Sequence, residues 1–320
     1  MEYQITDPKG ASRLVLRVFD GNDIALDFHE GGQRLAITFT SFERDGGAKV
    51  DGWSGTVDRL GLSGLFFISK KNHWFNSVEL PEALEAANAI SRRYDQVTAL
   101  GGSMGAHAAI RLAERLAVDA VVAVSPQYCI RQSLVPFERR WQDCAQNISH
   151  YDTQISEVVP RCPVYIIFDD AFTDDLKHAQ LIQRWTEAML VPLAHSGHSS
   201  ATALADLRLL DRMFELTGNP TRDATIVHEI ERSFAENSDR SATVICNRLE
   251  ALTASERPSA VAAIPNDVVG IAKSKARLHR LIEQVRAHTP NQDENEAHRA
   301  AAEHQQTFKS MRLFRWMLGQ

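Results

Sequence analysis

The residues best suited to do chemistry are Ser103, then Asp170 or Asp175, then His198, in that order along the chain. A serine hydroxyl is a weak nucleophile, so it needs a base to accept its proton and an acid to orient that base. The order serine, acid, histidine is typical of proteins whose serine lies in a G-x-S-x-G turn. The three residue types therefore predict nucleophilic catalysis through an acyl-enzyme.

The serine occupies the middle of the turn Gly101-Gly102-Ser103-Met104-Gly105. The apolar run 97–100 before it predicts a buried strand, and the alanine-rich segment 106–113 after it predicts a helix. A side chain at either outer glycine would collide with its neighbours, so glycine permits the sharp turn that exposes the hydroxyl. In the alternative interpretation the serine only caps the helix. The strand before the turn and the helix after it favour the nucleophile.

The predicted base is His198, which lies in the small-residue loop Ser196-Gly197-His198-Ser199. Such a loop lets an imidazole turn back over the end of a sheet. The alternative is an ordinary surface histidine. His195 adjoins the preceding strand, and we expect it to be structural.

The predicted acid is Asp170, which directly follows a strand and would reach the histidine from there. Asp175 is the second choice, because at the start of the next helix it could equally be an N-cap or a favourable charge near the helix dipole. Asp169 is expected to shape the turn. The sequence leaves the choice of acid open.

Oxyanion donors and a substrate pocket are also expected. The N–H of Met104 begins a helix, where it can stabilise a developing negative charge. A second donor is expected from the backbone of Ser41 or Phe42, which follow the third predicted strand. Trp74 and His73 lie on the loop after the fourth predicted strand and are candidates to line the pocket. The alternative role for Trp74 is simple packing.

The order of elements predicts an α/β sandwich with a mostly parallel sheet, in which catalytic loops follow the carboxyl ends of the strands. The irregular residues 126–160 predict an insertion or cap above the sheet. Eight apolar runs predict strands: 14–19, 24–28, 35–40, 64–69, 97–100, 120–124, 163–168 and 190–194.

The length of 320 residues predicts two domains, an α/β domain over 1–218 and a helical domain over 219–320. Apolar residues recur at helical spacing in four sets after residue 219. These stripes would pack on one another, on the first domain, or on another chain. A homodimer or a protein partner bound through 219–320 is therefore one interpretation. The four sets are Ile226, Ile230 and Phe234; Ile245, Leu249 and Leu252; Leu278, Leu281, Ile282 and Val285; and Phe314, Met317 and Leu318.

Composition excludes several classes of partner. The net charge of −6 argues against nucleic acid or an anionic membrane as the main partner. No apolar run is long enough to span a bilayer, and the first residues lack a secretory signal.

Four widely spaced cysteines are expected to be reduced thiols in a cytoplasmic protein, with a Cys129–Cys144 bridge as the alternative. No metal-ligand spacing is found, so no metal or other cofactor is expected.

The sequence resembles the α/β-hydrolase superfamily over residues 13–216. The resemblance rests on Gly101-x-Ser103-x-Gly105, the strand end at Asp169 and Asp170, and the Gly197-His198 loop. It implies an eight-stranded fold and a triad of Ser103, an aspartate and His198. The chain departs from the family after the third strand, where Thr40-Ser41-Phe42 replaces a His-Gly-Gly run.

A fainter resemblance is to bacterial hydrolase-like proteins linked to surface-glycan synthesis. It rests on Trp74-Phe75, Ser125-Pro126-Gln127, and Asp169 with Asp175-x-x-His178. This second resemblance favours Asp175 over Asp170 as the acid, and it implies a glycan-linked acyl substrate.

Together these features predict a serine hydrolase that cleaves an ester or thioester of a small or glycan-linked acyl group. One alternative is a non-catalytic accessory protein of a biosynthetic complex, with the helical region as its docking module. A second alternative is acyl transfer to an alcohol by the same triad. The superfamily contains all of these activities, so fold alone does not choose among them.

Overall fold

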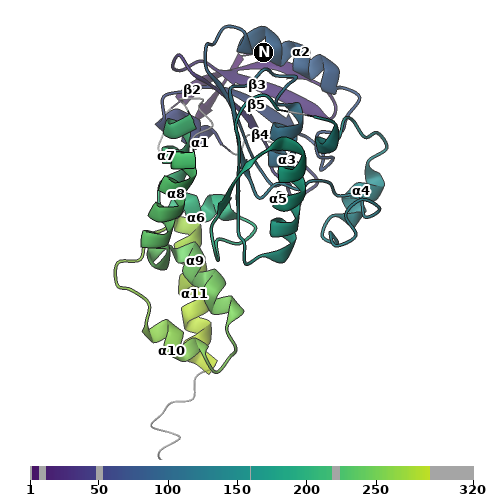
Figure 1. Ribbon diagram of the computed structural model, residues 1–320. Helices are drawn as coiled ribbons and strands as arrows, with labels where there is room; N and C mark the ends of the chain where they lie inside the picture. Colours follow the sequence, from purple (N-terminus) through teal and green to yellow (C-terminus); the bar gives the residue numbers. More distant parts are fainter. Residues whose placement is uncertain (1, 7–11, 48–52, 159, 218–223, 289–320) are drawn as a thin grey trace, which may run out of the picture.

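The computed structural model describes residues 2–6, 12–47, 53–158, 160–217 and 224–288 (Figure 1). Its centre is one sheet, whose strands in the described residues run in the order β1-β2-β3-β5-β4-β6-β7-β8-β9. The strands are β1 (Glu2–Thr6), β2 (Ser12–Asp20), β3 (Ile24–His29), β4 (Leu35–Phe39), β5 (Ser63–Ser69), β6 (Val97–Gly102), β7 (Ala120–Val124), β8 (Val164–Phe168) and β9 (Met189–Pro192).

The sheet is antiparallel at one side and parallel over the rest. Pairs from β1 to β3, and the β3–β5 pair, are antiparallel, whereas every pair from β5 and β4 through to β9 is parallel. The exchanged positions of β4 and β5, together with the parallel half, make this the α/β-hydrolase fold. All eight predicted strands are present, and β1 is an additional strand at the antiparallel edge.

Helices cover both faces of the sheet, and further helices extend away from it. They are α1 (Ser54–Arg59), α2 (Leu80–Ser91), α3 (Met104–Leu112), α4 (Gln142–Asn147), α5 (Thr173–Thr186), α6 (Ser200–Asp206), α7 (Leu209–Thr217), α8 (Ala224–Asn237), α9 (Ala242–Ala251), α10 (Arg257–Ala262) and α11 (Ala272–His288), with 3-10 turns at Ile155–Glu157 and Ser238–Arg240. Neither α1 nor α4 was expected from the sequence. The second of these, α4, lies within the predicted insertion.

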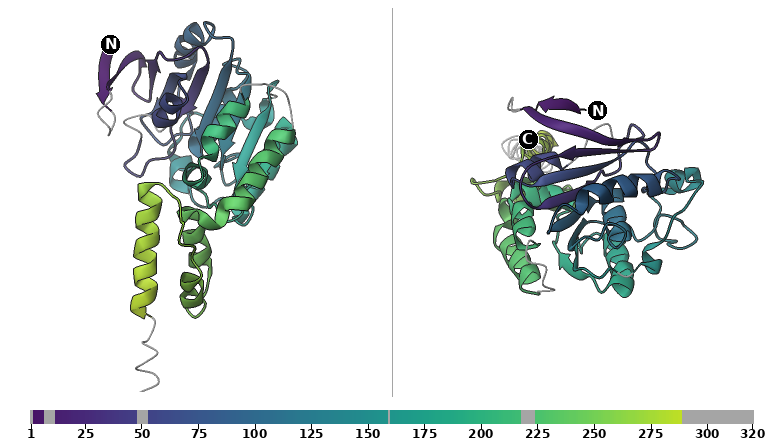
Figure 2. Two further views of the ribbon diagram at one scale, coloured as in Figure 1. Left: turned by 90° about the vertical axis from the view of Figure 1, so that its left-hand side faces the viewer. Right: turned by 90° about the horizontal axis from the view of Figure 1, so that it is seen from above.

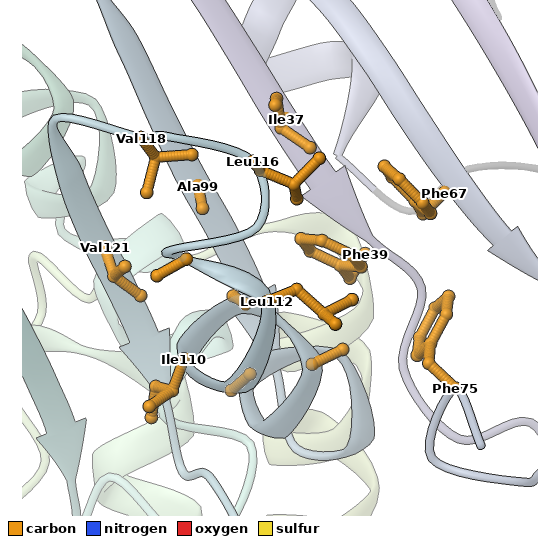
Figure 3. Packing of buried hydrophobic residues seen from close by; sticks show 14 of the residues in the cluster. Ile37, Phe39, Phe67, Phe75, Ala99, Ile110, Leu112, Leu116, Val118 and Val121 are labelled. Atoms are coloured by element: carbon orange, nitrogen blue, oxygen red, sulfur yellow. The ribbon is translucent and has the colours of Figure 1, made fainter. Parts of the chain in front are cut away.

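Alternation along the strands divides the core into two layers. Successive strand residues point to opposite faces of a sheet. In β6, Ala99 packs with α2, α3 and α5, whereas Leu100 packs with α1, α6, α7 and α8. Figure 3 shows the first layer, where Ile110 and Leu112 of α3 lie against Phe39 and neighbouring strand residues. The helix that begins at Ser103 is therefore held firmly against the sheet.

The helices after residue 223 belong to two different clusters. The apolar face of α8 shares a cluster with β8 and β9, so α8 packs on the sheet rather than apart from it. The helices α9, α10 and α11 form a smaller cluster of their own and extend away from the sheet (Figures 1 and 2). A domain boundary at residue 218 stays a prediction. The fourth apolar set, around Phe314, lies outside the described residues.

Asp206, at the end of α6, joins this smaller cluster to the rest of the chain. Its buried carboxylate accepts hydrogen bonds from the hydroxyls of Ser241 and Ser274 and from the N–H groups of Thr243 and Ile271. These four donors lie at the starts of α9 and α11. One carboxylate therefore fixes both helices to α6.

None of the helices in the described ranges is both long and apolar enough to cross a membrane. All four cysteines carry free thiols.

Candidate active site

Ser103 lies at the junction of β6 and α3 with a backbone conformation that few residues other than glycine adopt. Its φ is 51° and its ψ is −116°, and its N–H donates to the carbonyl of Val124 at 2.8 Å. A Cβ at Gly101 would overlap the backbone of Gly105, and a Cβ at Gly105 would overlap the carbonyls of Phe39 and Thr40. The two glycines therefore allow α3 to approach the sheet closely, while the serine carries the strain.

The imidazole of His198 meets the hydroxyl of Ser103. The distance from His198 Nε2 to Ser103 Oγ is 3.0 Å, and His198 Nδ1 lies 2.8 and 3.0 Å from the two carboxylate oxygens of Asp175. Asp175 is buried, whereas the His198 side chain is 25% exposed. Because a carboxylate only accepts, Nδ1 carries the proton and Nε2 is free to accept one from the serine.

Asp170, the first choice of acid, is not the carboxylate that contacts His198. It is exposed in the turn after β8, while Asp175 sits in the first turn of α5 with its side chain buried toward the histidine. Asp169 has different partners. It accepts hydrogen bonds from the N–H groups of His195 and Gly197 at 2.9 and 2.7 Å, which shapes the loop that carries His198.

Gln127 also contacts the serine. Its only signal in the sequence was the faint resemblance carried by Ser125-Pro126-Gln127. Its Nε2 lies 3.0 Å from Ser103 Oγ, and its Oε1 accepts the indole N–H of Trp74 at 2.9 Å. An indole N–H can only donate, so it orients the amide with its NH₂ group toward the serine. Ser103 Oγ can therefore accept from Gln127 while it donates to His198.

The insertion adds a buried ion pair beside Asp175. Arg140 Nη1 donates to Asp175 at 3.1 Å, and Arg140 Nη2 donates to Glu138 at 2.6 Å. Glu138 is fully buried and also lies 2.9 Å from His178 Nε2. Because the Tyr128 N–H donates to His178 Nδ1, the proton of that imidazole is on Nε2 and faces Glu138. Neither Glu138 nor Arg140 was predicted as a site residue, because irregular sequence gives no register for its side chains.

Hydrogen bonds keep Glu138 ionised in spite of its burial. Burial raises the pKa of its carboxyl, but the bonds from His178 and Arg140 outweigh burial and lower the pKa to about 2. Asp175, the candidate acid, therefore has the guanidinium of Arg140 beside it. The ionised carboxylate of Glu138 holds that guanidinium in place.

We expect Arg140→Met to lower the free energy of unfolding by about 3 kcal/mol, because it strips a buried carboxylate of its cation. Glu138 would keep only the His178 ring and the residue-140 N–H among its partners. Urea unfolding at pH 7 measures the loss. Arg139→Met is the matched control, since Arg139 is exposed, and it should change stability by less than about 0.5 kcal/mol. Equal stability of both variants would contradict the assigned ion pair.

Aromatic side chains surround the serine and histidine. Trp141 lies between Phe42, Trp74 and His198, with ring centroids 4.7, 5.5 and 6.2 Å away, and the Phe172 ring lies 6.3 Å from His198. Trp74 is buried and is linked to Ser103 through Gln127, and its role in lining a substrate pocket stays a prediction.

His73 does not join this group. Its ring contacts Ser69 and Phe75. That His73 lines a pocket beside Trp74 stays a prediction.

The predicted oxyanion donors lie beside the turn. Met104 is the first residue of α3, where an N–H has no acceptor within the helix. Ser41 Oγ donates to the carbonyl of Gly102 at 2.9 Å, which holds the loop after β4 against the nucleophile turn. The backbone of Ser41 and Phe42 thus passes next to the serine.

Two buried histidines outside the triad have strongly lowered pKa values. Burial lowers the pKa of His107 to about 3 and that of His73 to about 4. His107 packs behind the site, with Nδ1 2.9 Å from the carbonyl of Gln127. Both imidazoles are therefore neutral in the folded protein at neutral pH.

We expect His107→Gln to reduce the slope with which the free energy of unfolding falls as pH is lowered below 6.5. Below pH 6.5 the unfolded chain protonates this histidine and the folded chain does not, so wild-type stability falls as pH falls toward 3. The His107 contribution to the slope is about 1.4 kcal/mol per pH unit well below pH 6.5. Urea unfolding between pH 6.5 and 5 measures it. His150→Gln, at an exposed histidine, should leave the slope as in wild type; equal slopes for all three proteins would show that His107 is not neutral when folded.

In the described part of the chain, no cluster of three histidine, cysteine or acidic side chains could hold a metal ion. The site consists of a serine, an imidazole and a carboxylate with amide and guanidinium neighbours.

Comparisons with known proteins gave matches among solved structures alone. No protein-family model matches the chain, and neither does any curated protein. Among solved structures, Est1E from Butyrivibrio proteoclasticus matches at 12% identity, covering 64% of this chain and 98% of its own, with a TM-score of 0.45. A capsule O-acetyltransferase of Neisseria meningitidis serogroup A matches at 13% identity, 64% and 93% coverage and a TM-score of 0.45. An esterase of Pyrococcus furiosus matches at 12% identity, 67% and 89% coverage and a TM-score of 0.42.

Proposed function

We propose that the protein is a serine hydrolase that cleaves an ester or thioester through an acyl-enzyme on Ser103. The observation that supports this most is the unbroken hydrogen-bond path from Ser103 Oγ through His198 to Asp175. These side chains come from the start of α3, the first turn of α5 and the loop after β9, which lie far apart in sequence. A nucleophile, a base and an orienting acid within hydrogen-bond distance are what acyl transfer requires.

In the proposed reaction Ser103 Oγ attacks the acyl carbon, and His198 Nε2 takes the hydroxyl proton. The tetrahedral intermediate collapses as His198 gives that proton to the departing alcohol or thiol, which leaves the acyl group on Ser103. Water then attacks the acyl-enzyme with His198 as base, and the acid is released as Ser103 recovers its proton. Asp175 stabilises the imidazolium that forms in each half.

The developing oxyanion would be stabilised by the N–H of Met104 and by a backbone N–H from Ser41 or Phe42. Both sources flank the nucleophile, one at the amino end of α3 and one on the loop after β4. Removing one such donor typically costs two to three powers of ten in kcat. The amide of Gln127 is a further donor within reach of the serine.

The experiment that tests this proposal is labelling with a fluorophosphonate probe, followed by peptide mapping and a panel of activated acyl esters. We expect one modified residue, Ser103, and measurable turnover of at least one short-chain ester. A folded protein that takes no label and turns over no ester would favour the accessory role for this chain. Turnover that rises on addition of an alcohol, with the ester of that alcohol as product, would favour acyl transfer over hydrolysis.

A further inference from the structure

The loop that carries His198 is held from two sides. Toward the sheet, Asp169 accepts the N–H groups of His195 and Gly197. From the opposite side, Asn247 of α9 donates its side-chain N–H to the carbonyl of His195 at 2.8 Å. A Cβ added at Gly197 would lie only 2.8 Å from the Asn247 side-chain nitrogen. The Asn247 amide therefore packs directly against Gly197.

The loop conformation needs such support. His195 and Gly197 have φ values of 63° and 73°, in the left-handed region, and for a histidine that conformation carries a cost. Strained backbone persists only where the surroundings hold it. Here the surroundings include a helix from the part of the chain that otherwise has no evident chemistry.

The position of Asn247 is itself fixed by the chain that leaves His198. From the histidine the chain enters α6, which ends at Asp206, and Asp206 accepts hydrogen bonds from Ser241 and Thr243 at the start of α9. Little more than one turn further along α9, Asn247 returns to His195. The loop thus runs directly into α6, Asp206 binds α6 to the start of α9, and Asn247 binds α9 back to the loop.

We propose that Asn247 of α9 is a positioning residue for the proposed active site, which keeps His198 in line with Ser103. This proposal rests on the proposed function of the triad. Asn247 is not a catalytic residue, since it touches the loop backbone and not the reacting atoms. A displacement of about 1 Å at a catalytic group can cost on the order of a hundredfold in rate.

The test compares three variants in the full chain. Asn247→Ala removes the donor and suits a helix, and Asn247→Asp keeps the shape but can only accept. Glu250→Gln is the control: it breaks the 2.6 Å Glu250–Arg277 ion pair, which joins α9 to α11 on the exposed surface.

Two readouts are needed. We expect both Asn247 variants to lower kcat and the rate of fluorophosphonate labelling at Ser103 by about ten- to a hundredfold, with KM within about twofold of wild type. Amide hydrogen exchange over residues 194–200 should be faster in both. The Glu250→Gln variant should match wild type in every measurement.

The outcomes separate this inference from the proposed function. Unchanged labelling and unchanged exchange in the Asn247 variants would overturn the positioning role. Equal losses in Glu250→Gln would also overturn it, because they would point to general loosening of the helices. Faster loop exchange in the Asn247 variants, in a protein whose wild type takes no label, would support the positioning role and reject the hydrolase.

Discussion

Ser103→Ala should abolish the turnover of activated esters, with kcat falling by roughly a millionfold where wild-type activity allows the measurement. The reason is that no other group in the arrangement can take the place of Ser103 Oγ between His198 and Gln127. Alanine keeps the Cβ of serine and removes only the hydroxyl, so we expect the turn and the fold to remain. Initial rates and active-site titration with a fluorophosphonate measure both effects.

The matched control is Ser133→Ala, at an exposed serine of the insertion, which should behave as wild type. Equal hydrolysis by wild type and Ser103→Ala would reject the nucleophile and with it the proposed mechanism. Loss of labelling without loss of turnover would place the chemistry at another residue.

Asp175→Asn should lower kcat by about three to four powers of ten and change KM little. An amide next to His198 Nδ1 can donate to it, which favours the tautomer with its proton on Nε2, and that tautomer cannot accept from Ser103. The lost charge also leaves Arg140 Nη1 without the carboxylate it now contacts. Steady-state kinetics on the best ester of the panel measures the effect.

Asp170→Asn is the natural comparison, because it makes the same chemical change five residues earlier on an exposed side chain. We expect its kcat to lie within about twofold of wild type. The reverse result, with Asp170→Asn inactive and Asp175→Asn active, would mean that His198 takes its orientation from the other aspartate.

The nucleophile turn could be predicted from sequence because its causes are local. Gly101 and Gly105 are needed where backbone approaches backbone, and the residues that they meet lie in the turn itself or on the adjacent strand β4. His198 could be predicted because the parallel strands place the loop after β9 at the same edge as Ser103. Short apolar runs likewise predicted eight strands of the fold.

The choice between Asp170 and Asp175 could not be made from sequence, because it depends on where α5 begins and which way its first turn faces. α5 starts at Thr173, which buries Asp175 and leaves Asp170 outside the helix. Glu138 and Arg140 were out of reach for a related reason. They come from an irregular insertion whose path is set by contacts with Asp175 and His178, far along the chain.

The ends of the fold were also hard to predict. β1 is short and mixes polar with apolar residues, and its pairing with β2 is what defines it. The apolar stripe of α8 showed a helix but not its partner, which is the sheet itself. Periodicity reports which face of a helix is buried and does not say against what.

Asp206 also has a consequence for how the chain is made. The groups that satisfy its carboxylate lie 35 to 68 residues downstream, and the last of them, at Ser274, is close to the end of α11 nearest the sheet. While the ribosome is still adding those residues, the end of α6 is an unpaired charge that resists burial. We therefore expect the end of α6, and the loop carrying His198 before it, to settle into place only after Ser274 has been synthesised.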